Sequence, residues 1–377
     1  MKLTIGGSPC THWSIAKKQG RETEPEGQGW ELFQNYKIAL VKFRPDYFLY
    51  ENNNSISAAI KERITLELGV EPIMINSALV SAQSRKRVYW TNIPGVRQPK
   101  DRRLVVRDIL ESGIPLTEKA YTLKANYIHT NEVNALDYDH FPAPMAAEPM
   151  RIGTIESGTR TNHDSKPFRV YSPDGKAVTL QGEAGGYGAK TGLYAVPIDP
   201  NFGTFKVPIT LDAEGQMVAG IEGRARVIYE VRGGRITVKG KQLKANLADG
   251  LYIIRRLTVL ECKRLQTVPD SYIFPVSDTQ AYRQLGNGWT VDVIAHILSF
   301  CPGITEKPLE VLSMYDGMSC GRLALDKLGA RVAAYWATEI DKYAIKTTQA
   351  NFPDTVQLGD AFQVREDGWK PWEGAKQ

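Results

Sequence analysis

Apolar and polar positions follow two different periods along the first hundred residues. Apolar side chains recur every three or four positions over residues 30–43 and again up to Leu68, which predicts two amphipathic helices. We expect Ser55 to cap the second helix and Gly69 to end it. Short apolar runs around these helices predict strands, at residues 3–5, 47–50, 72–77 and 88–91. Strands that alternate with helices indicate a doubly wound α/β sheet, whose functional groups gather at the carboxyl ends of the strands.

A second α/β series begins near residue 310. Its strands are expected at 310–314, 332–338 and 356–358, and its helices at 322–328 and 342–351. Between the two series, residues 121–250 carry short β-like runs with frequent Gly and Pro, which is typical of a separate, loop-rich β domain. Helical periodicity returns at 258–265 and 290–300. We therefore divide the chain into three segments, 1–118, 119–275 and 276–377, and expect the first and third to form one large domain.

The composition is that of an ordinary globular protein. The 377 residues are 42% hydrophobic and 24% charged, and the formal net charge is +5. This mild basicity permits a polyanionic partner without requiring one. The four cysteines include no CxxC pair, which argues against a disulfide framework or zinc site and favours a reducing cytoplasm. With no signal-peptide pattern and no run of 18 apolar residues, we expect a soluble, cytoplasmic protein.

The first strand is followed by the sequence GGSPC. Gly6 and Gly7 let the backbone turn sharply, and Pro9 stiffens the approach to Cys10. A cysteine on a rigid turn beyond a strand end is where an α/β protein places a nucleophile. Most free cysteines are instead small buried hydrophobic residues. These residues alone leave both interpretations of Cys10 open.

The second series opens with a glycine turn, DGMSCG at 316–321, and Glu339 follows about twenty positions later. Glycines permit close approach of a ligand to the backbone, and a carboxylate at that spacing can bind ribose hydroxyls. The turn is not a strict GxGxxG, which favours a nucleoside cofactor other than a dinucleotide. An ordinary β–turn–α unit is the alternative.

Together these segments resemble the DNA cytosine-5 methyltransferases, which use S-adenosylmethionine. The resemblance covers nearly the whole chain outside residues 121–245, and INSALVSAQSRKRVYWTNIPG resembles the branch with the animal de novo methyltransferases and their phage and bacterial relatives. The matching segments are GGSPC (6–10), ENN (51–53), QSRKR (83–87), RRLTVLECKRLQTVPDSY (255–272), QLGNGWTVDVI (284–294), SMYDGMSCG (313–321), TEI (338–340) and GDA (359–361). The resemblance implies a Rossmann-like methyltransferase sheet and a smaller target-recognition domain at 119–275.

The resemblance also implies roles at the catalytic end. Cys10 would add to C6 of a flipped-out cytosine, and Glu51 would hold or protonate the ring nitrogen N3. Arg87 would contact the cytosine O2, and Arg85 would orient the site. We expect the polar loop at 11–29 to be a mobile lid over the base.

On the cofactor side, the resemblance implies that Tyr315 stacks on adenine, Glu339 binds the ribose hydroxyls and Asp360 binds the adenine amino group. Asn287 and Trp289 would close the methionine end. The expected S-adenosylmethionine site comprises Pro9, Asn287, Trp289, Tyr315, Asp316, Gly317, Met318, Gly321, Glu339, Ile340, Asp360 and Ala361. No metal is expected.

The order of the motifs differs from that of the family. Cofactor motifs normally come first, whereas here they follow the QLGNGW segment, so the chain resembles a circular permutant. If so, both ends of the chain build one sheet and the strand at 356–358 lies near that at 3–5.

We expect duplex DNA as substrate, a prokaryotic or phage-infected cell as host, and a cognate restriction endonuclease as a candidate partner. An RNA cytosine-5 methyltransferase and a catalytically silent DNA-binding homologue are the alternatives. The target DNA sequence and the oligomeric state are not readable from the chain.

Overall fold

The computed structural model describes most of the two α/β segments and isolated strands of the region between them. The described residues are 1–9, 11–14, 19–111, 151–154, 169–171, 177–178, 193–198, 209–211, 217–221, 224–233, 235–238, 241–244 and 249–370. Cys10 lies outside them, as does much of the segment predicted to recognise DNA.

A seven-stranded sheet contains strands from both ends of the chain. Its order is β19 (Val356–Gly359), β18 (Val332–Thr338), β17 (Leu309–Met314), β1 (Lys2–Gly6), β2 (Tyr47–Asn53), β5 (Lys86–Thr91) and β3 (Ile73–Asn76). Neighbouring strands from β19 to β2 pair in parallel, whereas β5 runs antiparallel to both β2 and β3. The doubly wound sheet predicted from the sequence is confirmed.

The first strand occupies the middle of this sheet. β1 pairs with β17 in parallel, from Lys2 opposite Glu310 to Gly6 opposite Met314, and with β2 on its other side. Both ends of the chain therefore build one sheet, as the permuted motif order predicts. β19 belongs to the same sheet as β1, but β18 and β17 lie between them.

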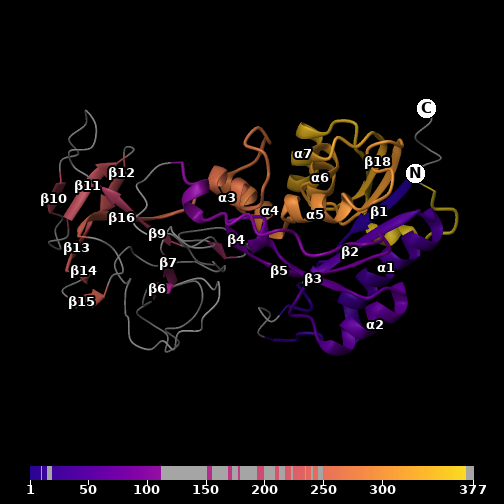
Figure 1. Cartoon of the computed structure of the whole chain (residues 1–377), viewed down its shortest axis with the longest axis horizontal. Coiled ribbons are helices and arrows are strands. Elements are labelled where there is room, and N and C mark those ends of the chain that lie inside the picture. Colours follow the sequence, from indigo (N-terminus) through magenta and orange to yellow (C-terminus); the bar gives the residue numbers. More distant parts are fainter. Residues whose placement is uncertain are drawn as a thin grey trace.

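Helices cover both faces of the sheet (Figure 1). On one face α1 (Gly27–Phe43) and α2 (Ala58–Leu68) enclose a core that includes Tyr50, Leu312 and Met314. On the other face lies a second core, which includes Leu3, Ile5 and Val311. The helices on that side are α3 (Val259–Leu265), α4 (Asp278–Asn287), α5 (Val291–Leu298), α6 (Cys320–Lys327) and α7 (Lys342–Asn351). Short 3-10 turns lie at Ser77–Leu79, Val106–Ile109 and Ala361–Arg365.

Three local features differ from the sequence predictions. Ser57, not Ser55, caps α2 by accepting the N–H of Ile60, because Ser55 is engaged by the side chain of Asn53. Glu51 to Asn53 continue β2 instead of following it. α4 was not predicted: its sequence is mostly polar, and the few apolar residues that it buries are Ala281, Tyr282 and Leu285.

The middle segment is rich in β structure, as predicted. One seven-stranded sheet has the order β15-β14-β13-β16-β9-β7-β6, and β10, β11 and β12 form a three-stranded sheet. These strands are β6 (Arg151–Thr154), β7 (Arg169–Tyr171), β9 (Leu193–Ile198), β10 (Ile209–Leu211), β11 (Met217–Ile221), β12 (Arg224–Val227), β13 (Tyr229–Arg232), β14 (Arg235–Val238), β15 (Lys241–Lys244) and β16 (Gly250–Arg256). A short parallel pair, β4 (Gln83–Ser84) with β8 (Ala177–Val178), joins this segment to the QSRKR motif.

The β-rich middle segment ends, and the large α/β unit resumes, close to Leu257. Leu257, Cys262 and Leu265 belong to the core under the large sheet, and Thr258 forms a capping box with Glu261 at the start of α3. Among the described residues, no helix is long and apolar enough to span a membrane.

Candidate active site

The turn after β1 packs directly on the end of β2. A side chain on Gly7 would place its Cβ 2.8 Å from the carbonyl oxygen of Glu51 and 2.9 Å from Glu51 Oε2. Only glycine therefore fits at this position, and the turn lies against the carboxylate that the sequence singled out. Pro9 follows on the exposed surface, and Cys10, the predicted nucleophile, lies outside the described residues.

A buried polar cluster fixes this turn. The hydroxyls of Ser8 and Tyr50 are 2.6 Å apart, and the Asn52 amide donates to the Ser8 carbonyl at 3.3 Å. Burial raises the pKa of the Tyr50 phenol well above its ordinary value, so the phenol stays protonated and can donate to Ser8. The backbone that leads to Cys10 is thus anchored to β2.

Glu51 is held by one donor on each carboxylate oxygen. Arg87 Nε lies 3.0 Å from Glu51 Oε1, and Trp289 Nε1 donates to Oε2 at 2.9 Å. The residue is 8% exposed, so both contacts form in a largely water-free setting. Three motifs far apart in the sequence therefore meet at this carboxylate.

Arg85 has different partners. Its guanidinium donates to the carbonyl oxygens of Gly286 at 3.2 Å and Gly288 at 2.9 Å, at the carboxyl end of α4. A buried cation on the last carbonyls of a helix satisfies acceptors that the helix itself leaves unpaired. Arg85 thus fixes the segment that carries Trp289, whereas Arg87 contacts Glu51 directly.

A buried hydrogen-bond chain connects the same segments, and most of its members were not predicted. Ser77 donates to Thr290 at 2.8 Å, and Thr290 donates to Gln266 Oε1 at 2.9 Å. Gln83 also contacts Gln266 Oε1, at 3.1 Å, and Gln266 donates to the Leu285 carbonyl at 2.6 Å. Only the resemblance of their segments to family motifs could have drawn attention to Gln83 and Gln266.

The glycine turn after β17 adopts a tightly coiled backbone. Tyr315, Gly317 and Ser319 have φ values of 60°, 59° and 56°. The carboxyl group of Asp316 turns inward and accepts hydrogen bonds from Ser313 at 2.6 Å, Tyr335 at 2.8 Å and Ser319. Burial raises the pKa of Asp316 to about 6, although these hydroxyls oppose the shift. The side chain of Asp316 therefore stabilises the turn through hydrogen bonds within the protein.

Glu339 lies at the carboxyl end of β18, opposite this turn. Its carboxylate accepts the backbone N–H groups of Gly317 at 2.8 Å, Ile340 at 2.7 Å and Asp341 at 2.8 Å. Ile340 beside it is 74% exposed. Three backbone donors hold the half-buried carboxylate in one orientation next to an exposed apolar side chain.

The other predicted cofactor residues occupy varied positions. Tyr315 donates its hydroxyl to the Leu32 carbonyl in α1 at 2.7 Å, and Met318 is buried with its carbonyl bonded by Tyr272. At Gly321 an added Cβ would lie 2.2 Å from Ile5 Cδ1, so this glycine permits close packing of α6 on β1. Asp360 is exposed and caps the following turn, Ala361 is buried, and Asn287 is exposed at the end of α4.

Two parts of the 11–29 loop, residues 11–14 and 19–29, are described, and Trp13 anchors the first of them. Trp13 is fully buried in the core under α1 and α2, and its carbonyl accepts Arg21 Nε at 3.0 Å. Arg21 also donates to the Ser55 carbonyl at 2.5 Å. One indole that enters the core outweighs the polar character of its neighbours, which was the signal used from sequence.

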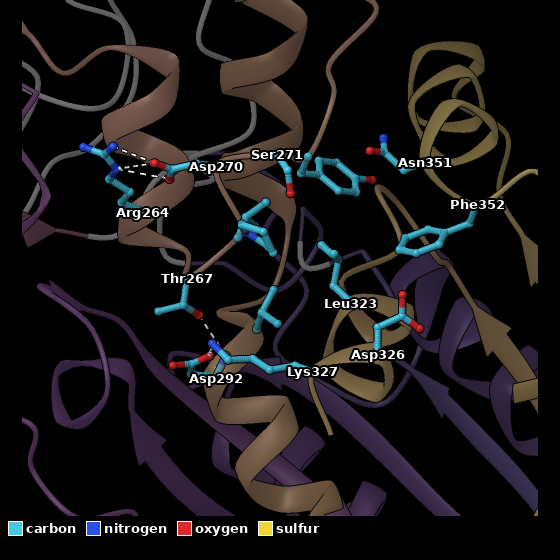
Figure 2. A pocket seen from close by; sticks show the side chains of 14 residues that line it. Arg264, Thr267, Asp270, Ser271, Asp292, Leu323, Asp326, Lys327, Asn351 and Phe352 are labelled. Atoms are coloured by element: carbon cyan, nitrogen blue, oxygen red, sulfur yellow. Dashed lines mark hydrogen bonds and ion pairs between the residues drawn. The ribbon is translucent and has the colours of Figure 1, made fainter. Parts of the chain in front are cut away.

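A separate cavity of about 720 Å³ lies between the second half of α6, the end of α7 and the 267–272 segment. Figure 2 shows its mixed lining, with Arg264 paired to Asp270 on one side and Phe352 and Leu323 on the other. Glu51, Arg87 and Glu339 do not line it. This cavity is distinct from the site described above.

The comparison with protein families decides the class of this protein. A model of the C-5 cytosine-specific DNA methylase family matches residues 1–301. The chain belongs to this family. The match ends before β17, so the residues with the predicted cofactor motifs at 313–321, 338–340 and 359–361 lie after it. The chain is accordingly a DNA cytosine methyltransferase.

Two type II methyltransferases and one solved structure are similar to this chain. The type II methyltransferase M.HpaII of Haemophilus parainfluenzae is 54% identical over 316 residues, 78% of this chain and 69% of that protein. The type II methyltransferase M.Bpa9945I of Bacillus paralicheniformis is 24% identical over 319 residues, 76% of this chain and 66% of that protein. A solved structure of the Entamoeba histolytica methyltransferase EhMeth has a TM-score of 0.40 and 14% identity, covering 79% of this chain and 76% of its own.

Proposed function

We propose that this methyltransferase transfers a methyl group from S-adenosylmethionine to C5 of a flipped-out cytosine in duplex DNA. The observation that carries the proposal is the meeting of three motifs at one carboxylate, where Arg87 and Trp289 each bind one oxygen of Glu51. Family membership supplies the class of reaction, and this arrangement supports catalytic roles for Glu51 and Arg87.

Cys10 acts as the nucleophile. C5 of cytosine is a poor nucleophile, so a thiolate must first add to C6. Cys10 follows the turn of Gly6 to Pro9 in the chain, and within that turn Gly7 lies directly against Glu51. Glu51 hydrogen-bonds N3 of the ring, and Arg87 stabilises the negative charge that spreads to the ring when sulfur adds.

The residues at the ends of β17 and β18 fit the methyl donor. Around Gly317, with φ of 59°, no atom lies within 4 Å of the place where a Cβ would be, so the turn leaves open space beside Glu339. Glu339 would hold the ribose hydroxyls, and Ile340 and Asp360 would border the adenine. S-adenosylmethionine supplies the methyl group that C5 takes up, after which loss of the C5 proton expels Cys10.

The middle segment serves target recognition. A base in a duplex is out of reach of Cys10, so it must be flipped out at a cost of roughly a few kcal/mol. Arg and Lys of this segment would bind phosphates, and a few side chains would contact base edges in the major groove. The pair β4–β8 joins this segment to the two residues directly before Arg85, and β5, which carries Arg87, follows at once. The type II names of both relatives favour a companion restriction endonuclease in a bacterial cytoplasm.

The test is transfer of a tritiated methyl group to duplex DNA and to RNA of mixed sequence. We expect incorporation into DNA, a covalent adduct on DNA that contains 5-fluorocytosine, and loss of both with Cys10→Ser because an alcohol is far less ionised than a thiol. Incorporation into RNA alone would make the protein an RNA methyltransferase. Substantial activity of Cys10→Ser would remove Cys10 from the mechanism, and no transfer to either substrate would indicate a silent DNA-binding homologue.

A further inference from the structure

Trp289 contacts the catalytic carboxylate, although the family resemblance placed it at the methionine end of the cofactor. We propose that Trp289 is a positioning residue for Glu51: its indole N–H fixes one carboxylate oxygen while Arg87 fixes the other. The proposal rests on the proposed function, because it is there that Glu51 binds N3 of the cytosine.

The two contacts define the plane of the carboxylate. Trp289 Nε1 lies 2.9 Å from Oε2 and Arg87 Nε lies 3.0 Å from Oε1. The backbone of Gly7 closes a third side, since even a Cβ there would be 2.9 Å from Oε2. With a donor on each oxygen, rotation about the last side-chain bond would break both contacts. Glu51 is therefore preorganised to meet one edge of a base.

Hydrogen bonds hold the residues on both sides of Trp289 in place. The carbonyl of the preceding Gly288 accepts Arg85 at 2.9 Å and Gln266 at 3.2 Å, and the following Thr290 donates to Gln266. Because its backbone is fixed on both sides, the Trp289 indole can hold the Glu51 carboxylate in one position. An indole has a single N–H donor, and at position 289 this donor is directed at one carboxylate oxygen of Glu51.

The same segment lies against the cofactor turn. A Cβ on Gly288 would lie 3.0 Å from Cys320 Sγ and 3.4 Å from Met318 Sδ. Cys320 is buried, and burial raises the pKa of its thiol to about 12, so it stays protonated and serves as a packing surface. Trp289 is thus seated between the turn for the methyl donor and the carboxylate for the base.

The experiment separates the indole N–H from the indole ring. Trp289→Phe removes the donor and keeps an aromatic ring, and a second variant carries benzothienylalanine at position 289, which keeps both fused rings and replaces N–H by sulfur. We expect the kcat for methyl transfer to fall roughly ten- to a hundred-fold in both, as for a lost hydrogen bond to a charged group. The KM for DNA and the Kd for S-adenosylmethionine, from calorimetry, should stay within about twofold of wild type.

Trp90→Phe is the matched control. Trp90 is fully buried and donates its indole N–H to Thr65 Oγ1 at 2.9 Å, not to Glu51. This variant loses the same type of hydrogen bond, so its stability should fall while its kcat stays that of the wild type. A kcat loss confined to position 289 therefore cannot arise from a general loss of packing.

Two results would overturn the proposal. A wild-type kcat in the benzothienylalanine variant would show that the N–H does not matter, even if Trp289→Phe folds poorly. A rise in the Kd for S-adenosylmethionine in step with the loss of kcat would assign Trp289 to the cofactor instead. Failure of the proposed function is a different outcome, because wild-type protein would then transfer no methyl group.

Discussion

The backbone N–H of Glu310 donates to the carbonyl oxygen of Met1 at 2.9 Å, so residues 309 positions apart are hydrogen-bonded neighbours. The Met1 amino group in turn donates to the Pro308 carbonyl at 2.9 Å. The order in which the strands occur in the chain is therefore decoupled from their order in the sheet.

We expect a reordered chain to fold and to be active. Joining residue 377 to residue 1 with a short flexible linker, and opening the chain between Pro302 and Pro308, keeps every strand pair of the sheet. Cofactor binding and cooperative urea unfolding should survive. As a control, opening the chain inside α1 next to the fully buried Tyr36 should abolish both. Loss of folding in the reordered chain would show that the fold also depends on the order of the strands in the chain, and not only on their pairing in the sheet.

Mutation of Arg85 should lower the stability of the protein, whereas mutation of Arg87 should lower its kcat. Arg85→Ala removes the Arg85 donor from the Gly286 carbonyl and leaves the Gly288 carbonyl with Gln266 alone, so it should destabilise the protein by about 2–4 kcal/mol. Arg87→Lys keeps the charge but loses the guanidinium contact to Glu51, so it should lower kcat roughly tenfold at nearly unchanged stability. Urea unfolding and methyl-transfer kinetics on both variants distinguish these roles. Equal stability losses would show that Arg87 is structural as well.

Glu339→Ala should weaken binding of S-adenosylmethionine by on the order of 1–3 kcal/mol, because the ribose hydroxyls lose a charged acceptor. The variant also frees the N–H of Gly317 and loosens the turn. Calorimetry without DNA measures the effect, and Glu62→Ala on the exposed face of α2 serves as control. An unchanged dissociation constant would mean that the cofactor binds elsewhere.

Asp316 should give the stability a recognisable pH dependence. Its pKa rises from 3.8 to about 6 on folding, so between these values the folded state binds more protons than the unfolded state. The stability contributed by Asp316 is therefore greatest below about pH 4 and is lost as the pH rises through about 6.

Asp316→Asn removes this titration. The stability of wild type minus that of the variant should fall by about 1–3 kcal/mol between about pH 4 and about pH 7. Urea midpoints of both proteins across this range measure the difference, in which contributions from other groups cancel. A constant difference would show that the carboxyl is not desolvated on folding.

The sequence by itself determined the α/β alternation, the permuted order of the motifs and the class of chemistry. Strands such as 332–338 and helices such as 342–351 were predictable to the residue, because local periodicity and turn residues set their limits. Candidate groups such as Glu51, Arg87 and Glu339 stood out because each belongs to a short motif at a strand end.

Only the tertiary structure decided which of these groups meet. Trp289 reaches Glu51 across 238 positions, and Arg85, two residues from Arg87, turns instead to the end of α4. The burial of Trp13 and the chain from Ser77 to Gln266 were likewise hidden, because they depend on pairings between distant segments. Local pattern fixes which side chains a segment offers, but the packing of sheet and helices chooses the partner of each, since hydrogen bonds and ion pairs act only over a few ångströms.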